Sequence, residues 1–293
     1  MDQRNEIRQF LASRRARITP QQAGLPTYGA NRRVPGLRRE EVALLAGVSV
    51  DYYTQMERGN LGGVSDSVLH ALAGALQLDE AEQAHLFDLA RTATTPARPR
   101  QPSGPQWVRP SIQRLLDAMA GVPAYVRTGR LDILAVNRLG RALYASVRDG
   151  QPLPVNLARF LFLDPRAGDF YVDWVKTAHD AVAILRGEAG RNPYDRRLSD
   201  LVGELSTRSE EFRARWAAHN VRLHRTGQKQ LHHPVAGALE LTYEALELPA
   251  DPGLTMITYT AEPGSATQDA LDFLASWAAT LDQSETAQAP DQA

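Results

Sequence analysis

The sequence predicts two domains: an all-α helix–turn–helix domain, followed by an α+β domain with a five-stranded antiparallel sheet. Three observations predict this multi-domain fold. The chain has 293 residues, which is long for one domain. Helical patterns fill its first third, and strand patterns appear only later. Between them lies TATTPARPRQPSGPQWVRP at 92–110, whose prolines exclude a helix and predict an extended linker.

The expected boundaries follow from these patterns. We expect a helix–turn–helix domain at 1–93, a linker at 94–110, an α+β domain at 111–282 and a disordered polar tail at 283–293.

The first domain is expected to be a set of short helices. Residues 4–17 place Ile7, Phe10 and Leu11 on one side of a helix. Prolines and glycines at 18–38 predict a loop, and three to four helices follow up to about Thr92.

The second domain is expected to begin with a helix at 111–119 and a β-hairpin in VPAYVRTGRLDILAVN, whose turn contains Gly129. Helical patterns follow at 138–146, 156–163, 169–188, 195–206 and 209–219. Three β-rich runs come next, and in LELTYEA apolar and polar residues alternate strictly, which predicts one buried face. Two strands before the helical middle and three after it give the five-stranded sheet. A last helix is expected at 267–281.

Charge is distributed unevenly along the chain. The net charge is −1, yet residues 1–60 contain ten arginines and six acidic residues, a local charge of +4. A basic front predicts a polyanionic partner for that part alone. An alternative is codon bias, because the whole chain has only two lysines, Lys176 and Lys229.

Several classes of site are not expected. The chain has no cysteine, so disulfides and thiol chemistry are excluded. His232 and His233 are adjacent and point to opposite faces of a strand, and no HExxH, P-loop, dinucleotide or nucleophile motif occurs. We therefore expect no metal site, no catalytic residue and no required cofactor. The lack of a long apolar run and of a signal core predicts a cytoplasmic protein without membrane contact.

The stretch LRREEVALLAGVSVDYYTQMERGN, at 37–60, predicts the helix–turn–helix itself. Gly47 accepts a positive φ and ends the first helix, and Ser49 is a good N-cap for the second. Tyr53 and Met56, three residues apart, are expected to bury the second helix against the first. Its remaining residues are then exposed to a partner.

These residues carry a family resemblance. The spacing matches phage-repressor-type helix–turn–helix domains at Ala43, Gly47, Val48, Tyr53 and Met56. The longer string RRVPGLRREEVALLAGVSVDYYTQMERGN resembles the MmyB-like bacterial transcription regulators. So do VPAYVRTGRLDILAVNRLGRALY, NLARFLFLDPRA, VGELSTRSEEF and YTAEPGS. The resemblance implies binding to double-stranded DNA, and a PAS-like second domain that binds a fatty acid or a similar small apolar ligand.

The resemblance also implies DNA contacts. Val50, Asp51 and Gln55 take positions that read base edges in the major groove, where they suit a thymine methyl, a cytosine and an adenine. Arg39 takes the position of a phosphate contact. Further DNA-binding residues are expected to be Ser49, Tyr52, Thr54 and Arg58, with a basic arm of Arg32, Arg33 and Arg38.

Each of these roles has a structural alternative. Tyr52 can simply pack beside Tyr53, Asp51 can stabilise the helix N-terminus, and the arm can be a solvated loop. We expect Glu57 to form a structural pair with Arg14 or Arg15, because a carboxylate facing phosphate would be repelled.

Ligand contacts rest on the expected shape of the second domain. Polar candidates for the ligand head group are Asn137, Asn156 and Arg222, and candidate pocket walls are Phe160, Trp174, Tyr243 and Ile257. The alternatives are helix capping for Asn137 and core packing for the walls.

Two-fold operators match two-fold proteins, so we expect a homodimer on an inverted repeat. Two other readings stay open: a second domain that only dimerises, and an enzyme that carries a DNA-binding module.

Overall fold

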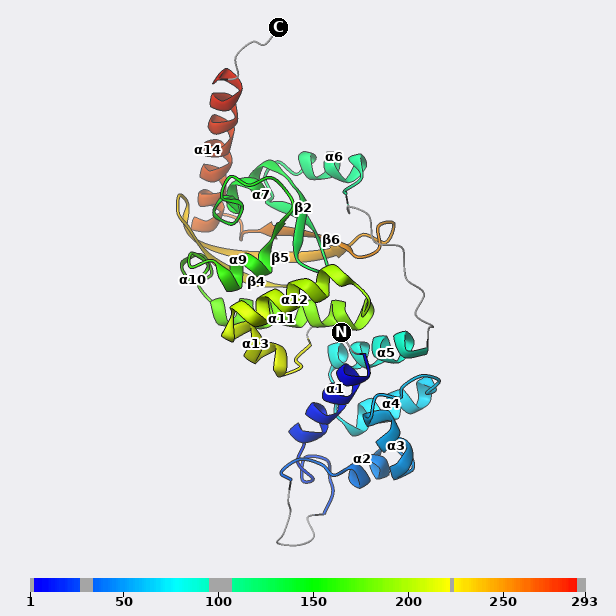
Figure 1. The fold of residues 1–293 in the computed structure, drawn as a ribbon. Helices are drawn as coiled ribbons and strands as arrows, with labels where there is room; N and C mark the ends of the chain where they lie inside the picture. The colour runs from blue at the N-terminus through cyan, green and yellow to red at the C-terminus, as the bar shows by residue number, and fades with distance from the viewer. Residues whose placement is uncertain (1–2, 27–33, 95–106, 222–223, 289–293) are drawn as a thin grey trace. The chain divides into compact units, whose positions relative to one another are not determined.

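A computed structural model describes residues 3–26, 34–94, 107–221 and 224–288 (Figure 1). The chain forms two compact units. The first, the helical unit, comprises Met1–Pro102 and Val182–Leu223. The second, the sheet unit, comprises Ser103–Ala181 and His224–Ala293. Within the described ranges, no helix is both long and apolar enough to cross a membrane.

The helical unit contains the predicted helix–turn–helix. Its N-terminal helices are α1 (Gln3–Arg17), α2 (Arg39–Leu45), α3 (Val50–Glu57), α4 (Asp66–Ala75) and α5 (Glu80–Thr94). The later segment adds the second half of α11 (Trp174–Arg191), then α12 (Arg196–Arg208) and α13 (Glu210–Ala217).

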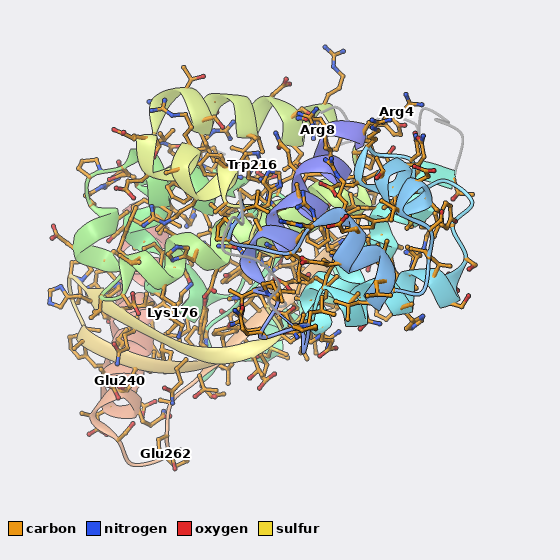
Figure 2. The ribbon with its side chains drawn as sticks, turned by 90° about the horizontal axis from the view of Figure 1, so that it is seen from below. Arg4, Arg8, Lys176, Trp216, Glu240 and Glu262 are labelled. Atoms are coloured by element: carbon orange, nitrogen blue, oxygen red, sulfur yellow. The ribbon has the colours of Figure 1, made fainter. Side chains whose placement is uncertain are left out.

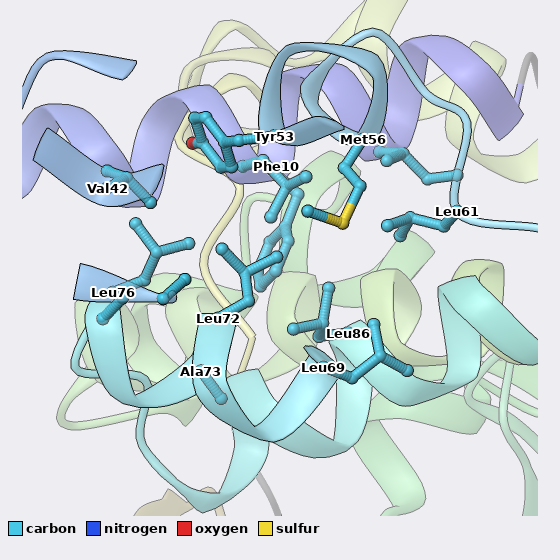
Figure 3. Close-up of a cluster of buried hydrophobic side chains, with 14 of the residues drawn as sticks. Phe10, Val42, Tyr53, Met56, Leu61, Leu69, Leu72, Ala73, Leu76 and Leu86 are labelled. Atoms are coloured by element: carbon cyan, nitrogen blue, oxygen red, sulfur yellow. The ribbon is translucent and has the colours of Figure 1, made fainter. Parts of the chain in front are cut away.

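One apolar core holds the first five helices together (Figure 3). Ile7, Phe10 and Leu11, the predicted apolar side of α1, are all fully buried in it. Tyr53 and Met56 of α3 enter the same core with no exposed surface. Burying a side chain of this size is worth roughly 1.5–3 kcal/mol, so these contacts fix how α3 lies on α1.

The sheet unit surrounds one antiparallel sheet. Its helices are α6 (Pro110–Ala118), α7 (Arg138–Leu143), α8 (Ala145–Arg148), α9 (Leu157–Leu163), α10 (Ala167–Phe170), the first half of α11, and α14 (Ala266–Gln288). Its strands are β1 (Ala124–Thr128), β2 (Asp132–Val136), β3 (Val155–Asn156), β4 (Thr226–His233), β5 (Gly237–Glu247) and β6 (Leu254–Thr260). The strand order is β3-β2-β1-β6-β5-β4.

The two faces of this sheet differ. Helix α6 covers the outer face, where Leu116 packs with Ala124, Val126 and Met256. Residues directly opposite each other in an antiparallel pair share a face, and Tyr125 lies opposite Ile257. This opposite side, the inner face, carries Tyr125, Arg127, Ile257, Tyr259, Tyr243 and Lys229.

The alternation predicted in β5 is confirmed, because Leu239, Leu241 and Tyr243 are buried while the residues between them are exposed. The predicted number of strands, however, is wrong: the sheet has six. The additional strand, β3, pairs Val155 with Ile133 and Asn156 with Asp132. A strand of two residues is too short to show alternation, so the sequence pattern did not reveal it.

The last helix is longer than predicted. Helix α14 continues to Gln288, through residues that the sequence analysis assigned to a polar tail. The added stretch contains neither glycine nor proline, so nothing in it stops a helix. Residues 289–293, and 95–106 of the predicted linker, lie outside the described part of the chain.

Each compact unit is built from two separate stretches of the chain. Val182–Leu223 belongs to the helical unit, although it lies inside the predicted α+β domain. Its Val221 is 9% exposed and joins the apolar core of the helix–turn–helix. Amphipathic periodicity predicts which side of a helix is buried, but not which core receives it.

Candidate DNA interface and ligand pocket

The turn between α2 and α3 has the predicted geometry. Gly47 has φ +64°, its N–H donates to the Leu44 carbonyl (3.2 Å), and the Val48 N–H donates to the Ala43 carbonyl (3.0 Å). This pair of bonds is a Schellman motif, which satisfies carbonyls at the end of α2. The Ser49 hydroxyl accepts from the backbone N–H of Tyr52 (3.1 Å), so Ser49 is the N-cap of α3.

Helix α3 is buried on one side and exposed on the other. Tyr53 and Met56 anchor it, whereas Val50 and Tyr52 are 46% and 40% exposed. The remaining predicted contact residues on or beside α3 are Asp51, Gln55 and Arg58, which are exposed, and Thr54, which is half-buried. The structure therefore brings the predicted α3 residues together along one accessible helix.

Gln55 has a neighbour that the sequence analysis missed. The side-chain amide of Asn60 donates to Oε1 of Gln55 (3.0 Å). This bond orients the Gln55 amide, and bidentate recognition of a base needs a fixed amide orientation. Asn60 follows Gln55 by five residues and lies beyond the end of α3, so the helical pattern did not indicate that it contacts Gln55.

Glu57 lies below this exposed face and is only 2% exposed. Its carboxylate pairs with Arg15 Nη2 (2.7 Å), one of the two predicted partners, and with Arg39 Nε (3.1 Å). Burial favours a higher pKa for Glu57, but hydrogen bonds from Arg15 and then Arg39 outweigh it, so the pKa is lowered. Glu57 therefore stays ionised and joins α1, α2 and α3.

Arg38 and Arg39 precede α3, and both of these predicted DNA contacts are accessible to solvent. Arg39 is 52% exposed despite its bond to Glu57, so it is available to a phosphate. Arg38 is exposed beside Glu40 (3.3 Å), and its backbone N–H donates to Oε2 of Glu41 (2.6 Å). The other two members of the predicted arm, Arg32 and Arg33, lie outside the described residues.

The predicted polar ligand contacts are used by the protein itself. Asn137 caps α7: its Oδ1 accepts from Gly140 and Ala124, and its Nδ2 donates to the carbonyls of Met119 and Val122. The capping alternative for Asn137 is thus confirmed. A ligand would have to displace these bonds to reach its amide.

The side chain of Asn156 is likewise bonded within the protein. It caps α9, and its Nδ2 donates to the Arg130 carbonyl (2.9 Å) and to Oδ1 of Asp132 (2.8 Å). The indole N–H of Trp174 donates to the Leu161 carbonyl (3.0 Å). Arg222, the third polar candidate, lies outside the described residues.

Three of the four apolar candidates belong to an aromatic layer on the inner face. Ile257 and Tyr243 come from the sheet and are buried, and Phe160 of α9 is buried with its ring centroid 5.8 Å from that of Phe170. Phe170 in turn lies 5.9 Å from Tyr144. Phe160, Tyr243 and Ile257 are therefore part of one layer, whereas the ring of Trp174 lies against Phe162, with 5.9 Å between the ring centroids.

Buried hydroxyl groups cross this layer, which the sequence analysis did not foresee. The hydroxyls of Tyr144 and Tyr259 are 2.7 Å apart, and the Tyr125 ring centroid is 5.3 Å from that of Tyr144. Burial raises the pKa of both Tyr144 and Tyr259 well above its usual value, so these hydroxyls stay neutral. Tyr144 and Tyr259 are 115 residues apart in sequence, so the sequence alone gives no hint of this cluster.

Two cations also lie on the inner face. The Lys229 ammonium is 5.2 Å from the centroid of the Tyr171 ring, and Arg127 is 5% exposed. Burial lowers the pKa of Lys229 to about 8; the charge of Asp180 opposes this shift and the charge of Arg127 adds to it. The positive charges of Lys229 and Arg127 therefore repel each other, on the same face of the sheet as the aromatic layer.

A groove of about 650 Å³ opens on the other side of the sheet, between α6 and β2. Its lining contains none of the predicted ligand residues and consists of Trp107, Val108, Pro110, Gln113, Arg114, Leu134, Ala135, Leu153 and Pro154. Trp107 is 75% exposed, so this groove is open to solvent beside that residue.

Two known families match the chain, each over a different part of it. The family of the MmyB-like transcription regulator ligand binding domain matches residues 108–274. A helix-turn-helix domain family matches residues 6–86. No curated protein matches the chain significantly.

Proposed function

The chain belongs to the MmyB-like transcription regulators, and on that premise we propose that it binds operator DNA through α3 in response to a small ligand with an apolar body and an acidic head group. It has a helix–turn–helix for DNA and a ligand-binding domain for a small molecule. We place it in the cytoplasm, with no cofactor beyond this ligand.

The observation that carries the DNA-binding role is the presentation of α3. A glycine turn and a serine cap fix its N-terminus, a buried salt bridge fixes its inner side, and its outer side offers polar residues. An exposed helix with this support suits the major groove, which is about 12 Å wide. Eight residues make a helix about 12 Å long, which reads only a few base pairs.

We therefore propose a homodimer on an inverted repeat, since two recognition helices double the sequence that is read. The test is selection of bound fragments from a random DNA pool, followed by footprinting. We expect a two-fold symmetric site, with half-sites one helical turn apart or a multiple of it. A lone asymmetric site occupied by one chain would contradict the proposal.

The ligand proposal rests on the inner face of the sheet unit. The aromatic layer suits an apolar chain such as that of a fatty acid, and Lys229 and Arg127 suit a carboxylate. Among the predicted residues, Phe160, Tyr243 and Ile257 would contact the apolar part.

The experiment compares palmitate with hexadecanol, which has the same chain length without the charge. Calorimetry on the full-length protein should show that Lys229→Met weakens palmitate binding about tenfold or more but leaves hexadecanol binding nearly unchanged. Lys176→Met is the matched control, because Lys176 lies near β4 with its Nζ donating to the Gln228 carbonyl (3.4 Å) and its side chain exposed (Figure 2). Equal losses for both ligands would contradict an acidic head group at Lys229.

A further inference from the structure

A buried guanidinium joins α11 to α1 inside the helical unit. Arg186 of α11 is fully buried, donates to the carboxylate of Glu6 and the carbonyl of Trp216, and has Nη1 2.8 Å from Nδ1 of His219. Its guanidinium carbon lies 4.1 Å from the centroid of the Trp216 ring on α13. Removing one partner of a buried ion pair is strongly destabilising, so this attachment is firm.

A second set of contacts holds the same surfaces together. Arg14 of α1 is 2% exposed, donates to the His219 carbonyl and pairs with Glu82 of α5 (2.9 Å). On α11, a Cβ at Gly190 would lie 2.6 Å from Cε1 of His85, so the absence of a side chain at Gly190 leaves room for the His85 ring of α5. The described residues of Val182–Leu223 thus pack against α1 and α5.

Helix α1 extends this connection to the recognition helix. Arg15 follows Arg14 directly and holds Glu57 of α3, while Glu6 and Arg14 hold the α11–α13 segment. A displacement of α11 can therefore reach α3 through one helix, by contacts whose side chains are buried or half-buried.

The other half of α11 belongs to the sheet unit and begins at its inner face. Just before α11, Tyr171 forms a β-bridge with Leu231 of β4, and the Val172 N–H donates to the Gln230 carbonyl (3.3 Å). Asp180 lies close enough to Lys229 for its charge to act on the pKa of that lysine. The first half of α11 is therefore beside the residues proposed to bind the ligand head group.

We infer that α11 transmits ligand occupancy to DNA binding, with the Arg186–Glu6 pair as its attachment to the helix–turn–helix; this inference rests on the proposed function. Helix α11 is one uninterrupted element of 18 residues, about 27 Å long. A ligand that moves Trp174–Ala181 against β4 moves Arg186 with the same helix. The family match places Val182–Leu223 inside the ligand-binding domain, while its contacts place it with the helix–turn–helix.

Linkage makes this inference testable without a known ligand. If α11 connects the two events, DNA bound at α3 must also alter the inner-face half of α11. The experiment is hydrogen–deuterium exchange of full-length protein, with and without an operator selected from a random DNA pool. Wild-type protein should show altered exchange on DNA binding in peptides covering α1–α3 and also in peptides covering Trp174–Ala181.

Two variants test the attachment. In Arg186→Gln, and in Arg186→Lys if the first does not fold, the DNA-induced change at Trp174–Ala181 should fall at least several-fold while that at α3 remains. Lysine keeps the charge but lacks the planar fork that reaches Glu6 and Trp216 together. Arg208→Gln is the control, since Arg208 is 59% exposed, pairs with Glu204 of its own helix (3.1 Å) and should leave the wild-type pattern intact.

The outcomes separate the two levels of the proposal. If no DNA sequence is selected, the proposed function fails and this inference fails with it. An operator that binds while exchange changes stay confined to α1–α3 in wild-type protein overturns the inference alone. So does an unchanged response in both Arg186 variants, because Arg186 would then not be the attachment.

Discussion

Arg15 on α1 and Glu57 on α3 form a salt bridge, with Nη2 and Oε1 2.7 Å apart and the carboxylate almost fully buried. Arg39 on α2 bonds the other carboxylate oxygen at 3.1 Å. One side chain at the inner side of the recognition helix thus connects three helices. It fixes α3 without occupying its exposed face.

Glu57→Gln should lower the free energy of unfolding by about 2 kcal/mol, because it removes the charge from a buried pair while leaving both arginines in place. Urea unfolding at neutral pH measures this change. Glu40→Gln is the matched control: Glu40 is 63% exposed and pairs with Arg38, so its loss should cost less than about 1 kcal/mol. Equal effects of the two substitutions would mean that burial at Glu57 is unimportant.

Gly47→Ala should destabilise the protein by about 1 kcal/mol through its backbone conformation alone. Gly47 has φ +64°, and an added Cβ would meet no atom within 4 Å, so strain is the only cost. Gly74→Ala offers the opposite case, because Gly74 lies within α4 with equally open space and no positive φ. It should stabilise the protein by up to about 1 kcal/mol in thermal unfolding. Destabilisation by both would point to packing rather than backbone strain.

Gln55→Ala should weaken the preference for one base pair of the operator by about 1–3 kcal/mol. Asn60→Ala should weaken the same preference by a smaller amount, because Asn60 only orients the Gln55 amide. Arg39→Ala should instead weaken binding to all sequences alike and reduce the salt dependence. Binding assays on single-base operator variants at several salt concentrations check all three. The reverse pattern would mean that the base and phosphate roles are exchanged.

Glu6 should make the protein sensitive to acid. Burial favours a higher pKa for Glu6, but the hydrogen bond with His219 and the charge of Arg186 outweigh it and lower the pKa from 4.5 to about 2. The stabilisation is then present above about pH 4.5 and lost as the pH falls toward 2. The difference in unfolding free energy between wild type and Glu6→Gln should shrink over that range. A difference that stays constant with pH would exclude this role for Glu6.

The sequence predicted local features well because their causes are local. Gly47, Ser49 and the Tyr53–Met56 spacing act within one or two helical turns, and all have the predicted structure. The alternation in β5 likewise follows from the two-residue period of a strand.

Features that depend on distant parts of the chain were not predicted. The Arg186–Glu6 pair joins residues 180 positions apart, and nothing in either local sequence selects the other. The same holds for Tyr144 and Tyr259, whose hydroxyls meet only when β6 lies beside β1. The polar ligand candidates were chosen by residue type, and Asn137 and Asn156 proved to bond the backbone at helix starts.

We propose above that a small molecule bound in the sheet unit controls DNA binding by the helical unit. The most direct measurement is fluorescence anisotropy of labelled operator with full-length protein, at increasing laurate, myristate or palmitate up to the saturation that calorimetry defines. At least one of these ligands should shift the operator Kd by about fivefold or more, and operator DNA should shift the Kd of that ligand by the same factor. Saturating binding of all three with an unchanged operator Kd, or no binding of any, would contradict it.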